Sequence, residues 1–586
     1  MSRHDHRRSG PRSKRNQTPP PPGWRGWFVL TLFVAFAVVL AGRAFDLQVL
    51  DQAFLTKEGD KRHLRSVSVP AGRGVIKDRN GEPLALSAPT ESVWAVPGAV
   101  LEAPEKIAPL ARELNMPVSE LRSRLESYKG RQFLYLRRQL APTDARAVMA
   151  VDAPGVFLQR EYKRYYPAGE AAAQIVGMTN IDGRGQEGLE LNRDDYLHGE
   201  PGSRRVVKDR VGRVVEDLAE FQPPQAGHDL RLTIDSRMQY MAYRHIKAAV
   251  VKNDAKGGMV VMLDPTTGEL RAVASYPSFN PNDRDSIDPS GVRARAATDV
   301  MEPGSTVKPL LLAKALDSGL FDTDDVIHTK GWFMVGRLTV KDFRNYGDVD
   351  FAKILQKSSN VGAAHVGLKM GAEGVWRAYN DFGFGDITGS GFPGERFGVL
   401  KDFYEWNNVE TATASYGYGL AVTAFQLIRA YGAIADDGML RSLRLIEGEG
   451  ADMHVPPRRV LKAKTARTMR HLLEGVISPA GTATKAAIPG YRVAGKTGTA
   501  RKAGSGGYNA DRHQALFVGM APAEKPALVT LVMLDEPKKD AYYGGAVAAP
   551  VFAAVMRDAL RLLRVPPDDP SVLTASADTR SNGAGT

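Results

Sequence analysis

The sequence predicts an α+β protein that carries one N-terminal membrane helix and two folded regions after it. Three observations support this: a single apolar run near the N-terminus, a mixed polar region after it, and a C-terminal half in which strand-like runs at both ends enclose helical segments. That last pattern is typical of an α+β sheet domain. At 586 residues, 43% of them hydrophobic, the chain is long enough for two or three domains.

The N-terminus combines a basic tail with one apolar segment. Six lysine and arginine residues within positions 3–15, followed by a proline run, precede the uncharged stretch from Trp27 to Gly42. We expect residues 1–23 to form a cytoplasmic basic and proline-rich tail, and residues 24–44 to form a single-pass anchor with the rest of the chain outside. The alternative is a cleavable signal peptide, because Val39-Leu40-Ala41 resembles a cleavage site.

Composition narrows the classes of function. The formal net charge of +12 suits a nucleic acid, an anionic membrane, an anionic polymer or simple solubility, and does not choose among them. The chain has no cysteine, which rules out disulfides, thiol nucleophiles, cysteine-ligated zinc and iron–sulfur clusters.

Residues 45–228 read as a polar, non-catalytic α+β region, a pedestal for the part that follows. Helical patterning extends from about Pro104 to Leu125. Several glycine-bearing segments read as turns that require a positive φ: Arg73-Gly74, Asp78 to Gly81, Pro167 to Gly169 and Gly185 to Gly188.

Residues 229–565 read as the sheet domain, and residues 566–586 as a disordered polar tail. A helix is expected from Arg237 to Val251, followed by a hairpin of two strands, Gly258 to Leu263 and Glu269 to Ser275. Further strands are expected at Tyr491 to Ala494, Ala515 to Met520 and Ala527 to Leu534, and a final helix at Val547 to Leu563.

The first candidate for chemistry is Ser305, with Lys308 three residues later on the same face of a helix that is expected to begin at or just before Ser305. A serine at the positive end of a helix, next to a lysine whose pKa is lowered by burial, can act as a nucleophile with its own base. Pro309 fits only in the first turn of such a helix. Alone, this spacing also fits an exposed helix start.

Two further motifs contain polar groups in short patterns. Ser358 and Asn360 are two residues apart, so a hydroxyl and an amide can point the same way. Lys496-Thr497-Gly498-Thr499 follows a strand-like run, and alternation places Lys496 with Gly498 and Thr497 with Thr499. Glycine in an edge strand admits another backbone, as an added peptide strand requires, although a glycine bulge is an equal alternative.

Taken in order, Ser-x-x-Lys, Ser-x-Asn and Lys-Thr-Gly resemble the motifs of the class B penicillin-binding proteins. The resemblance extends through the pedestal, at Arg73-Gly74, Asp78 to Gly81, Arg164 with Tyr166 to Gly169, and Gly185 to Glu190 with Gly199 and Gly202. Ser415 to Leu420 and Tyr542 to Gly545 are most similar to the division-specific members of that class. The middle position of the second motif is Ser359, a position that varies in the family.

The resemblance implies a penicillin-binding transpeptidase fold, an antiparallel sheet flanked by helices, and a serine acyl-enzyme. By this analogy Ser305 attacks the penultimate D-alanine of a stem peptide, and an amine of a neighbouring peptide resolves the acyl-enzyme. Lys308 serves as base, Ser358 relays a proton and Lys496 supplies positive charge. Asn360, Thr497, Gly498 and Thr499 bind substrate, and the N–H groups of Ser305 and Thr499 form the oxyanion hole.

No metal or organic cofactor is expected. The implied partners are peptidoglycan stem peptides, β-lactams, an FtsW-type glycan polymerase and other divisome proteins, at the septum of the cytoplasmic membrane with the catalytic domain in the periplasm. Four alternatives remain: an elongation-specific transpeptidase, a β-lactamase, a penicillin-sensing receptor and an inactive divisome scaffold. An external domain removes nucleic acid as a partner.

Overall fold

The computed structural model describes residues 23–50, 64–208, 214–448, 456–504, 507–539 and 541–569. The chain divides into two compact units, residues 1–69 with 203–223, and residues 70–202 with 224–586. The predicted cytoplasmic tail lies outside the described residues except for Gly23. The predicted disordered tail lies outside them from residue 570 onward.

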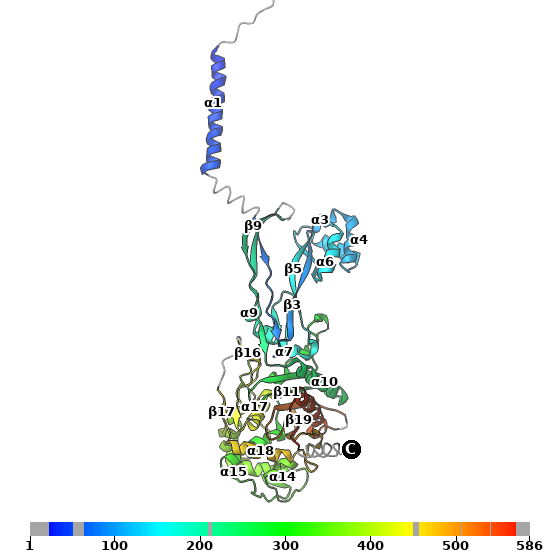
Figure 1. Ribbon diagram of the computed structural model, residues 1–586, viewed down its shortest axis with the longest axis vertical. Coiled ribbons are helices and arrows are strands. Elements are labelled where there is room, and N and C mark those ends of the chain that lie inside the picture. Colours follow the sequence, from blue (N-terminus) through cyan, green and yellow to red (C-terminus); the bar gives the residue numbers. More distant parts are fainter. Residues whose placement is uncertain are drawn as a thin grey trace, which may run out of the picture. The chain divides into compact units, whose positions relative to one another are not determined.

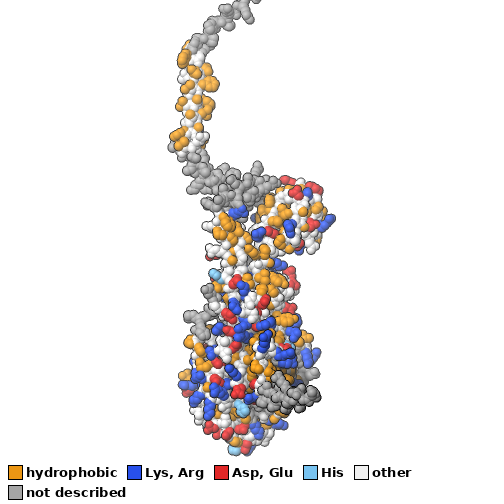
Figure 2. Space-filling model, viewed as in Figure 1, with side chains coloured by type: hydrophobic (Ala, Val, Ile, Leu, Met, Phe, Trp, Pro, Cys, Tyr) orange, Lys and Arg blue, Asp and Glu red, His pale blue; other side chains and the backbone are white. Residues whose placement is uncertain are grey.

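The first unit contains the apolar helix and a small sheet. Helix α1 (Gly23–Phe45) continues into the π-helical turn η1 (Asp46–Leu50). At 1.5 Å per residue, α1 is about 34 Å long, enough to cross a hydrocarbon core of about 30 Å. Its apolar side chains are uncovered along its length (Figure 2), which fits a membrane anchor. The sheet has the order β1-β8-β9, with strands β1 (Leu64–Val69), β8 (Gly202–Lys208) and β9 (Val214–Gln222).

The second unit begins with a mixed sheet of order β16-β10-β2-β3-β4, with β5 paired to β3 (Figure 1). Its strands are β2 (Ile76–Lys77), β3 (Pro83–Ala95), β4 (Leu134–Leu140), β5 (Val156–Tyr165), β10 (Leu230–Leu232) and β16 (Ile446–Glu447). Short helices pack on its outer end around a separate apolar core. These helices are α3 (Pro97–Leu101), α4 (Pro104–Glu113), α5 (Val118–Ser127) and α6 (Pro142–Ala150).

A buried charge network closes the inner end of this region. Glu190 is fully buried and accepts hydrogen bonds from Arg73 Nε at 2.5 Å and from Arg164 Nε at 2.7 Å. The elements around it are η2 (Gly169–Ala171), α7 (Ala173–Val176), β6 (Met178–Thr179), β7 (Gly185–Glu187), α8 (Gly188–Asn192) and α9 (Asp194–Leu197). Charges buried this deeply are stable only when they are paired, so the network ties residues near 73, 164 and 190 together.

The glycines predicted to lie in turns divide into two groups. Gly81, Gly169 and Gly188 have positive φ, as expected. Gly74 and Gly185 do not, and they are constrained by space instead. A Cβ on Gly74 would lie 1.9 Å from the carbonyl oxygen of His228, and one on Gly185 would lie 2.0 Å from that of Glu190. The sequence identified these positions correctly as glycine sites but gave the wrong reason for two of them.

The larger sheet of the second unit is antiparallel throughout, in the order β12-β11-β20-β19-β18. Its strands are β11 (Gly257–Leu263), β12 (Leu270–Tyr276), β18 (Ala494–Gly504), β19 (Gly507–Ala521) and β20 (Leu528–Asp535). Helices α10 (Ser236–Lys252) and α20 (Ala549–Leu562) cover one face, where Gly258 approaches Ile246 and Val250. Helix α17 (Ala424–Ala435) covers the other face, where Gly432 approaches Leu263 (Figure 1). The predicted fold class is therefore confirmed.

The remaining elements form the helical part beside this sheet. The helices are η3 (Arg284–Ser286), α11 (Pro289–Val292), α12 (Arg295–Thr298), η4 (Gly304–Val307), α13 (Lys308–Asp317), α14 (Phe351–Lys357), α15 (Asn360–Asp381), η5 (Phe403–Glu405), α16 (Asn408–Ala414), α18 (Ala463–Glu474), η6 (Thr484–Ala486) and α19 (Gly544–Val547). The short strands are β13 (Trp332–Val335), β14 (Leu338–Lys341), β15 (Met439–Leu440) and β17 (Arg458–Arg459).

One predicted strand is misplaced. The strand expected at Tyr491 to Ala494 begins only at Ala494 and continues to Gly504. Tyr491 and Arg492 instead bind the C-terminal segment: the Tyr491 hydroxyl donates to the carbonyl of Val565, and Arg492 N donates to the carboxylate of Asp568. These long-range contacts hold the two residues outside the sheet, although their sequence is strand-like.

Candidate active site

Ser305 lies in a tight turn between the sheet and helix α13. The turn is the 3₁₀ segment η4, and the α-helix proper begins at Lys308 with Pro309 in its first turn. The predicted helix start is therefore correct in position, but its first turn is 3₁₀ rather than α. Gly304 precedes Ser305 with φ +53°, and its N–H donates to the carbonyl of Gly417 at 3.1 Å.

Two close contacts fix the position of this turn. Gly417, in the predicted Ser415 to Leu420 motif, has φ +91°, and a Cβ there would lie 2.1 Å from the carbonyl oxygen of Gly304. On the sheet side, a Cβ on Gly498 would lie 2.7 Å from Thr306 Cγ2 and 3.1 Å from the carbonyl oxygen of Pro303. Only glycine permits both approaches, so the turn with Ser305 is held between β18 and the 417 loop.

Lys308 is fully buried and points toward the second motif. Its Nζ donates to the carbonyl of Ser358 at 2.6 Å and to Asn360 Oδ1 at 2.7 Å, and lies 3.3 Å from Ser358 Oγ. Among the described residues, no hydrogen bond joins Lys308 Nζ to Ser305 Oγ. A neutral lysine amine has two N–H groups and one lone pair, so the two short bonds leave the lone pair available.

The second motif bridges two helices in a strained backbone. Ser358 ends α14 in the left-handed conformation, with φ +57°, and Ser359 caps α15 by accepting from the N–H of Gly362. Asp342, just after β14, accepts from Ser359 Oγ at 2.6 Å and from the N–H of Asn360 at 2.5 Å. A left-handed non-glycine residue costs free energy and persists only where its surroundings impose it. The cap and Asp342 provide that constraint.

Lys496 reaches the same hydroxyl from the edge strand β18. It is fully buried, and its Nζ donates to Ser358 Oγ at 2.9 Å and to the carbonyl of Thr497 at 3.2 Å. Ser358 Oγ therefore lies between two lysine amino groups, one from the start of α13 and one from β18. The three predicted motifs meet at this hydroxyl.

The neighbours of Lys496 show the predicted alternation. Lys496 and Gly498 face Ser358 and the Ser305 turn, whereas Thr497 and Thr499 face α19 and its surroundings. Thr497 Oγ1 lies 3.1 Å from Thr482 Oγ1, and Thr499 Oγ1 accepts from the N–H of Gly544 at 3.1 Å. The prediction that β18 is a sheet edge is confirmed.

The electrostatics of the two lysines favour their neutral forms. Burial lowers the pKa of Lys496 to about 7. Burial also lowers the pKa of Lys308 well below its ordinary value, the charge of Lys496 lowers it further, and the carboxylate of Asp342 opposes that shift. An unprotonated amine near neutral pH is what a serine nucleophile requires of its base.

Sequence reasoning missed the residues that hold these motifs in place. Asp342 stands in no motif, and Tyr431, whose hydroxyl donates to the carbonyl of Thr306 at 2.7 Å, lies in the interior of α17. Thr482 likewise belongs to a loop with no evident signal. Each comes from a segment far away in the chain, so spacing alone could not identify it. Within the described residues, no group of three or more acidic or histidine side chains could hold a metal ion.

Comparison with known proteins agrees with this geometry. Residues 258–557 match the penicillin-binding protein transpeptidase domain, and residues 68–232 match the penicillin-binding protein dimerisation domain. The probable peptidoglycan D,D-transpeptidase PbpC of Pseudomonas aeruginosa is 40% identical over 96% of this chain and 99% of its own length. The peptidoglycan D,D-transpeptidase FtsI of Escherichia coli K12 is 40% identical over 93% of each chain.

Solved structures show the same fold. A peptidoglycan synthetase from Bifidobacterium adolescentis superposes with a TM-score of 0.69 at 25% identity, covering 86% of this chain and 98% of its own. The transpeptidase domain of Burkholderia pseudomallei penicillin-binding protein 3 superposes with a TM-score of 0.53 at 41% identity, covering 58% of this chain and 98% of its own. From its motifs, its fold and these relatives, the chain belongs to the class B penicillin-binding proteins, the family of peptidoglycan D,D-transpeptidases.

Proposed function

We propose that this transpeptidase cross-links stem peptides at the division septum through an acyl-enzyme on Ser305. The observation that carries the proposal is the position of Ser358 Oγ between two buried lysines, 3.3 Å from Lys308 Nζ and 2.9 Å from Lys496 Nζ. In this arrangement Ser358 can pass protons between the lysines and a substrate bound beside the serine turn.

In the acylation step, Ser305 Oγ attacks the carbonyl of the penultimate D-alanine and its proton passes to the lone pair of Lys308. The two hydrogen bonds to Ser358 O and Asn360 Oδ1 orient the amine for this transfer. The peptide C–N bond then breaks. The nitrogen of the leaving D-alanine takes a proton from Ser358 Oγ. A neighbouring lysine then donates a proton to Ser358 Oγ.

In the second step, the amine of a neighbouring stem peptide attacks the acyl-enzyme carbonyl. Its proton returns through the same relay to Ser305 Oγ as the ester C–O bond breaks, which forms the cross-link and restores the enzyme. The N–H groups of Ser305 and Thr499 would stabilise the oxyanion in both steps. A Cβ on Gly304 would lie 3.5 Å from the carbonyl oxygen of Thr499, so these two backbones are neighbours.

Substrate binding is assigned to the edge of β18 and to Asn360. Thr497 and Thr499 have hydroxyls able to donate to the substrate carboxylate, near the charge of Lys496. Gly498 permits the close approach of another backbone to this strand. Asn360 also forms hydrogen bonds within the protein. Its Oδ1 accepts from Lys308 Nζ, and its Nδ2 donates to the carbonyl of Lys341 at 3.3 Å.

The cellular setting is proposed from the anchor and the relatives. Helix α1 would anchor the enzyme in the cytoplasmic membrane, with residues 1–23 inside the cell, the pedestal of residues 45–228 and the transpeptidase domain of residues 229–565 in the periplasm. The septum and partnership with an FtsW-type polymerase and other divisome proteins are supported by 40% identity to a protein named FtsI. β-lactams would acylate Ser305 in place of the peptide.

A transfer assay and a localisation assay together test this function. The full chain in detergent, given a thioester analogue of the stem peptide and a free D-amino acid as acceptor, should form the exchanged product, and Ser305→Ala should not. A fluorescent fusion should gather at the septum. Product from the folded Ser305→Ala protein would exclude the nucleophile, and a side-wall pattern would favour an elongation role. Rapid β-lactam hydrolysis would instead indicate a β-lactamase.

A further inference from the structure

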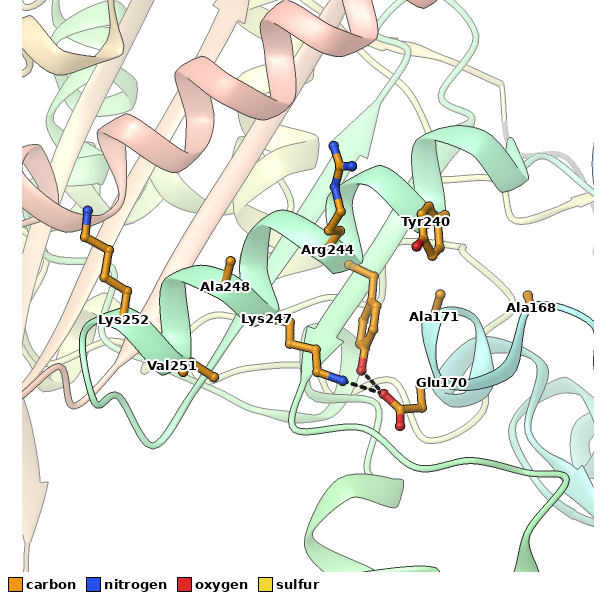
Figure 3. A pocket seen from close by; sticks show the side chains of 10 residues that line it. Ala168, Glu170, Ala171, Tyr240, Arg244, Lys247, Ala248, Val251 and Lys252 are labelled. Atoms are coloured by element: carbon orange, nitrogen blue, oxygen red, sulfur yellow. Dashed lines mark hydrogen bonds and ion pairs between the residues drawn. The ribbon is translucent and has the colours of Figure 1, made fainter.

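A second concave site lies along helix α10, apart from the catalytic residues. Figure 3 shows this site, a hollow of about 730 Å³ between α10 and the η2 segment of the pedestal. An adjoining hollow of about 550 Å³ shares Ala168, Ala171 and Tyr240 with it. The two form one groove, which we call the α10 groove. None of the residues lining it belongs to the three catalytic motifs.

The floor of the groove contains an ion pair with no net charge. Glu170 accepts from the Tyr243 hydroxyl at 2.5 Å and from Lys247 Nζ at 2.8 Å. The dashed lines in Figure 3 mark these bonds. The floor therefore adds no net charge to the groove, and the charge of its rim decides which ligand charge it favours.

The rim presents exposed apolar side chains and two cations along α10. Tyr240 is 61% exposed and Val251 is 62% exposed, a high value for an aromatic and a β-branched residue on one helix. Arg244 and Lys252 are exposed and form no ion pair within the described part of the chain. In Figure 3 both extend in the same direction from α10. They are eight positions apart, or about 12 Å along the helix.

The charge pattern identifies the kind of occupant. Cationic residues whose backbone positions are about 12 Å apart along a helix axis match carboxylates eight positions apart on a helix, or three to four positions apart in an extended segment at about 3.3 Å per residue. A second copy of this chain is a poor match, since it has a net charge of +12. The chain's own residues 570–586 contain one aspartate and one arginine, and so have no net negative charge to offer.

We propose that the α10 groove is a docking site for an acidic amphipathic segment of another protein. Its carboxylates would pair with Arg244 and Lys252, and its apolar side chains would pack against Tyr240, Ala248 and Val251. This is the helix-in-groove mode of peptide recognition, in which apolar anchors supply the affinity and flanking charges set the register. The site joins the pedestal to a helix of the transpeptidase domain, so a bound segment would contact both.

Site-specific photocrosslinking in the cells that make the protein tests this proposal. A photoreactive amino acid replaces Tyr240 in the full chain, and a second version carries it at Tyr404, which is 83% exposed and outside the groove. Light should produce a covalent adduct with another protein from position 240 only. Mass spectrometry should place the crosslink in a segment with two carboxylates at the spacing given above.

Charge reversal then distinguishes docking from chance proximity. Arg244→Glu with Lys252→Glu should lower the adduct yield about tenfold, since two exposed ion pairs together contribute about a decade in affinity. Replacing the two acidic residues of the partner with lysine should restore the adduct yield of this charge-reversed variant. A control pair at exposed arginines of the pedestal, Arg122→Glu with Arg131→Glu, should leave the yield unchanged, and β-lactam labelling should be normal in every variant.

Three results would overturn the proposal. The first is no adduct from position 240. The second is an adduct with lipid, glycan, another copy of this chain or its own tail. The third is a protein adduct whose yield is the same in the charge-reversed variant as in the wild type. Normal β-lactam labelling in the same cells shows that such a result concerns the groove and not the catalytic assignment.

Discussion

A methyl group added at Gly498 should disable the enzyme without unfolding it. The new Cβ would lie 2.7 Å from Thr306 Cγ2, and ordinary contact begins near 3.4 Å, so the turn that carries Ser305 must retreat by about 0.7 Å. A misplacement of about 1 Å between reacting groups can cost about 10²-fold in rate. We therefore expect Gly498→Ala to lower the acylation rate constant by one to two orders of magnitude, at a cost of about 1–3 kcal/mol in stability.

The assay is the second-order rate of acylation by a fluorescent penicillin, with the thermal midpoint measured on the same samples. Gly130→Ala is the matched control, because a Cβ there meets nothing within 4 Å. A second-site change sharpens the test. Thr306→Ser removes Cγ2 but keeps the hydroxyl that donates to the carbonyl of Pro303 at 2.6 Å. The double variant with Gly498→Ala should recover part of the lost rate, because the 3.1 Å contact with the carbonyl oxygen of Pro303 remains.

Two results would refute this reasoning. One is a folded Gly498→Ala protein that acylates within about twofold of the wild type, which would mean that the turn is not held against β18. The other is a double variant that is no faster than Gly498→Ala and has a normal thermal midpoint. That outcome would place the effect of the methyl group on the approach of the ligand rather than on the packing of Thr306.

Three further predictions concern charged side chains, two in the candidate site and one in the pedestal. Because the charge of Lys496 lowers the pKa of Lys308, Lys496→Met should raise that pKa and move the acid limb of the acylation profile to higher pH; an unmoved limb, or one moved to lower pH, would contradict this coupling. Asp342→Asn should slow acylation and cost about 1–3 kcal/mol in urea unfolding, since it weakens charged bonds to Ser359 and the next N–H, whereas unchanged rate and stability would remove its positioning role. Glu190→Gln should cost about 3–5 kcal/mol, since it removes the carboxylate that pairs with buried Arg164 and leaves Arg73 paired with Asp194 alone, and a loss below about 1 kcal/mol would show that the network is not structural.

The buried pair of lysines also sets how stability depends on pH. The pKa of Lys496 is about 7 in the folded protein and has its ordinary value, about 10.5, when unfolded. Between these values the unfolded chain binds more protons, so the contribution of Lys496 to stability rises with pH across that window. Near neutral pH the burial of Lys496 therefore lowers the stability of the folded protein, and this cost falls as the pH rises.

Local sequence patterns predicted most of the fold and the motifs of the site. Alternation and turn residues located the hairpin of β11 and β12, and the order of the three motifs indicated the family before any geometry was known. The prediction of a strand at Tyr491 was wrong because the Tyr491 hydroxyl donates to the carbonyl of Val565, more than seventy residues away. A sequence pattern that compares only nearby residues does not reveal such long-range contacts.

The candidate site shows the same limit. Spacing placed Ser305 and Lys308 on one helix face, yet Lys308 Nζ bonds to Ser358 and Asn360, which are about fifty residues farther along the chain. Asp342 escaped notice because a lone aspartate after a short strand has no distinguishing neighbours. Sequence proposed the groups for the chemistry, and the fold shows which groups contact them.

Intact-mass detection of a fluorescent penicillin adduct tests whether Ser305 is the nucleophile. We predict one adduct per chain on the wild-type protein, stable for the time of the measurement, and none on a Ser305→Ala protein of matching thermal midpoint. An equal adduct on the folded Ser305→Ala protein would contradict the assignment of the nucleophile. No adduct on the wild type would favour an inactive scaffold.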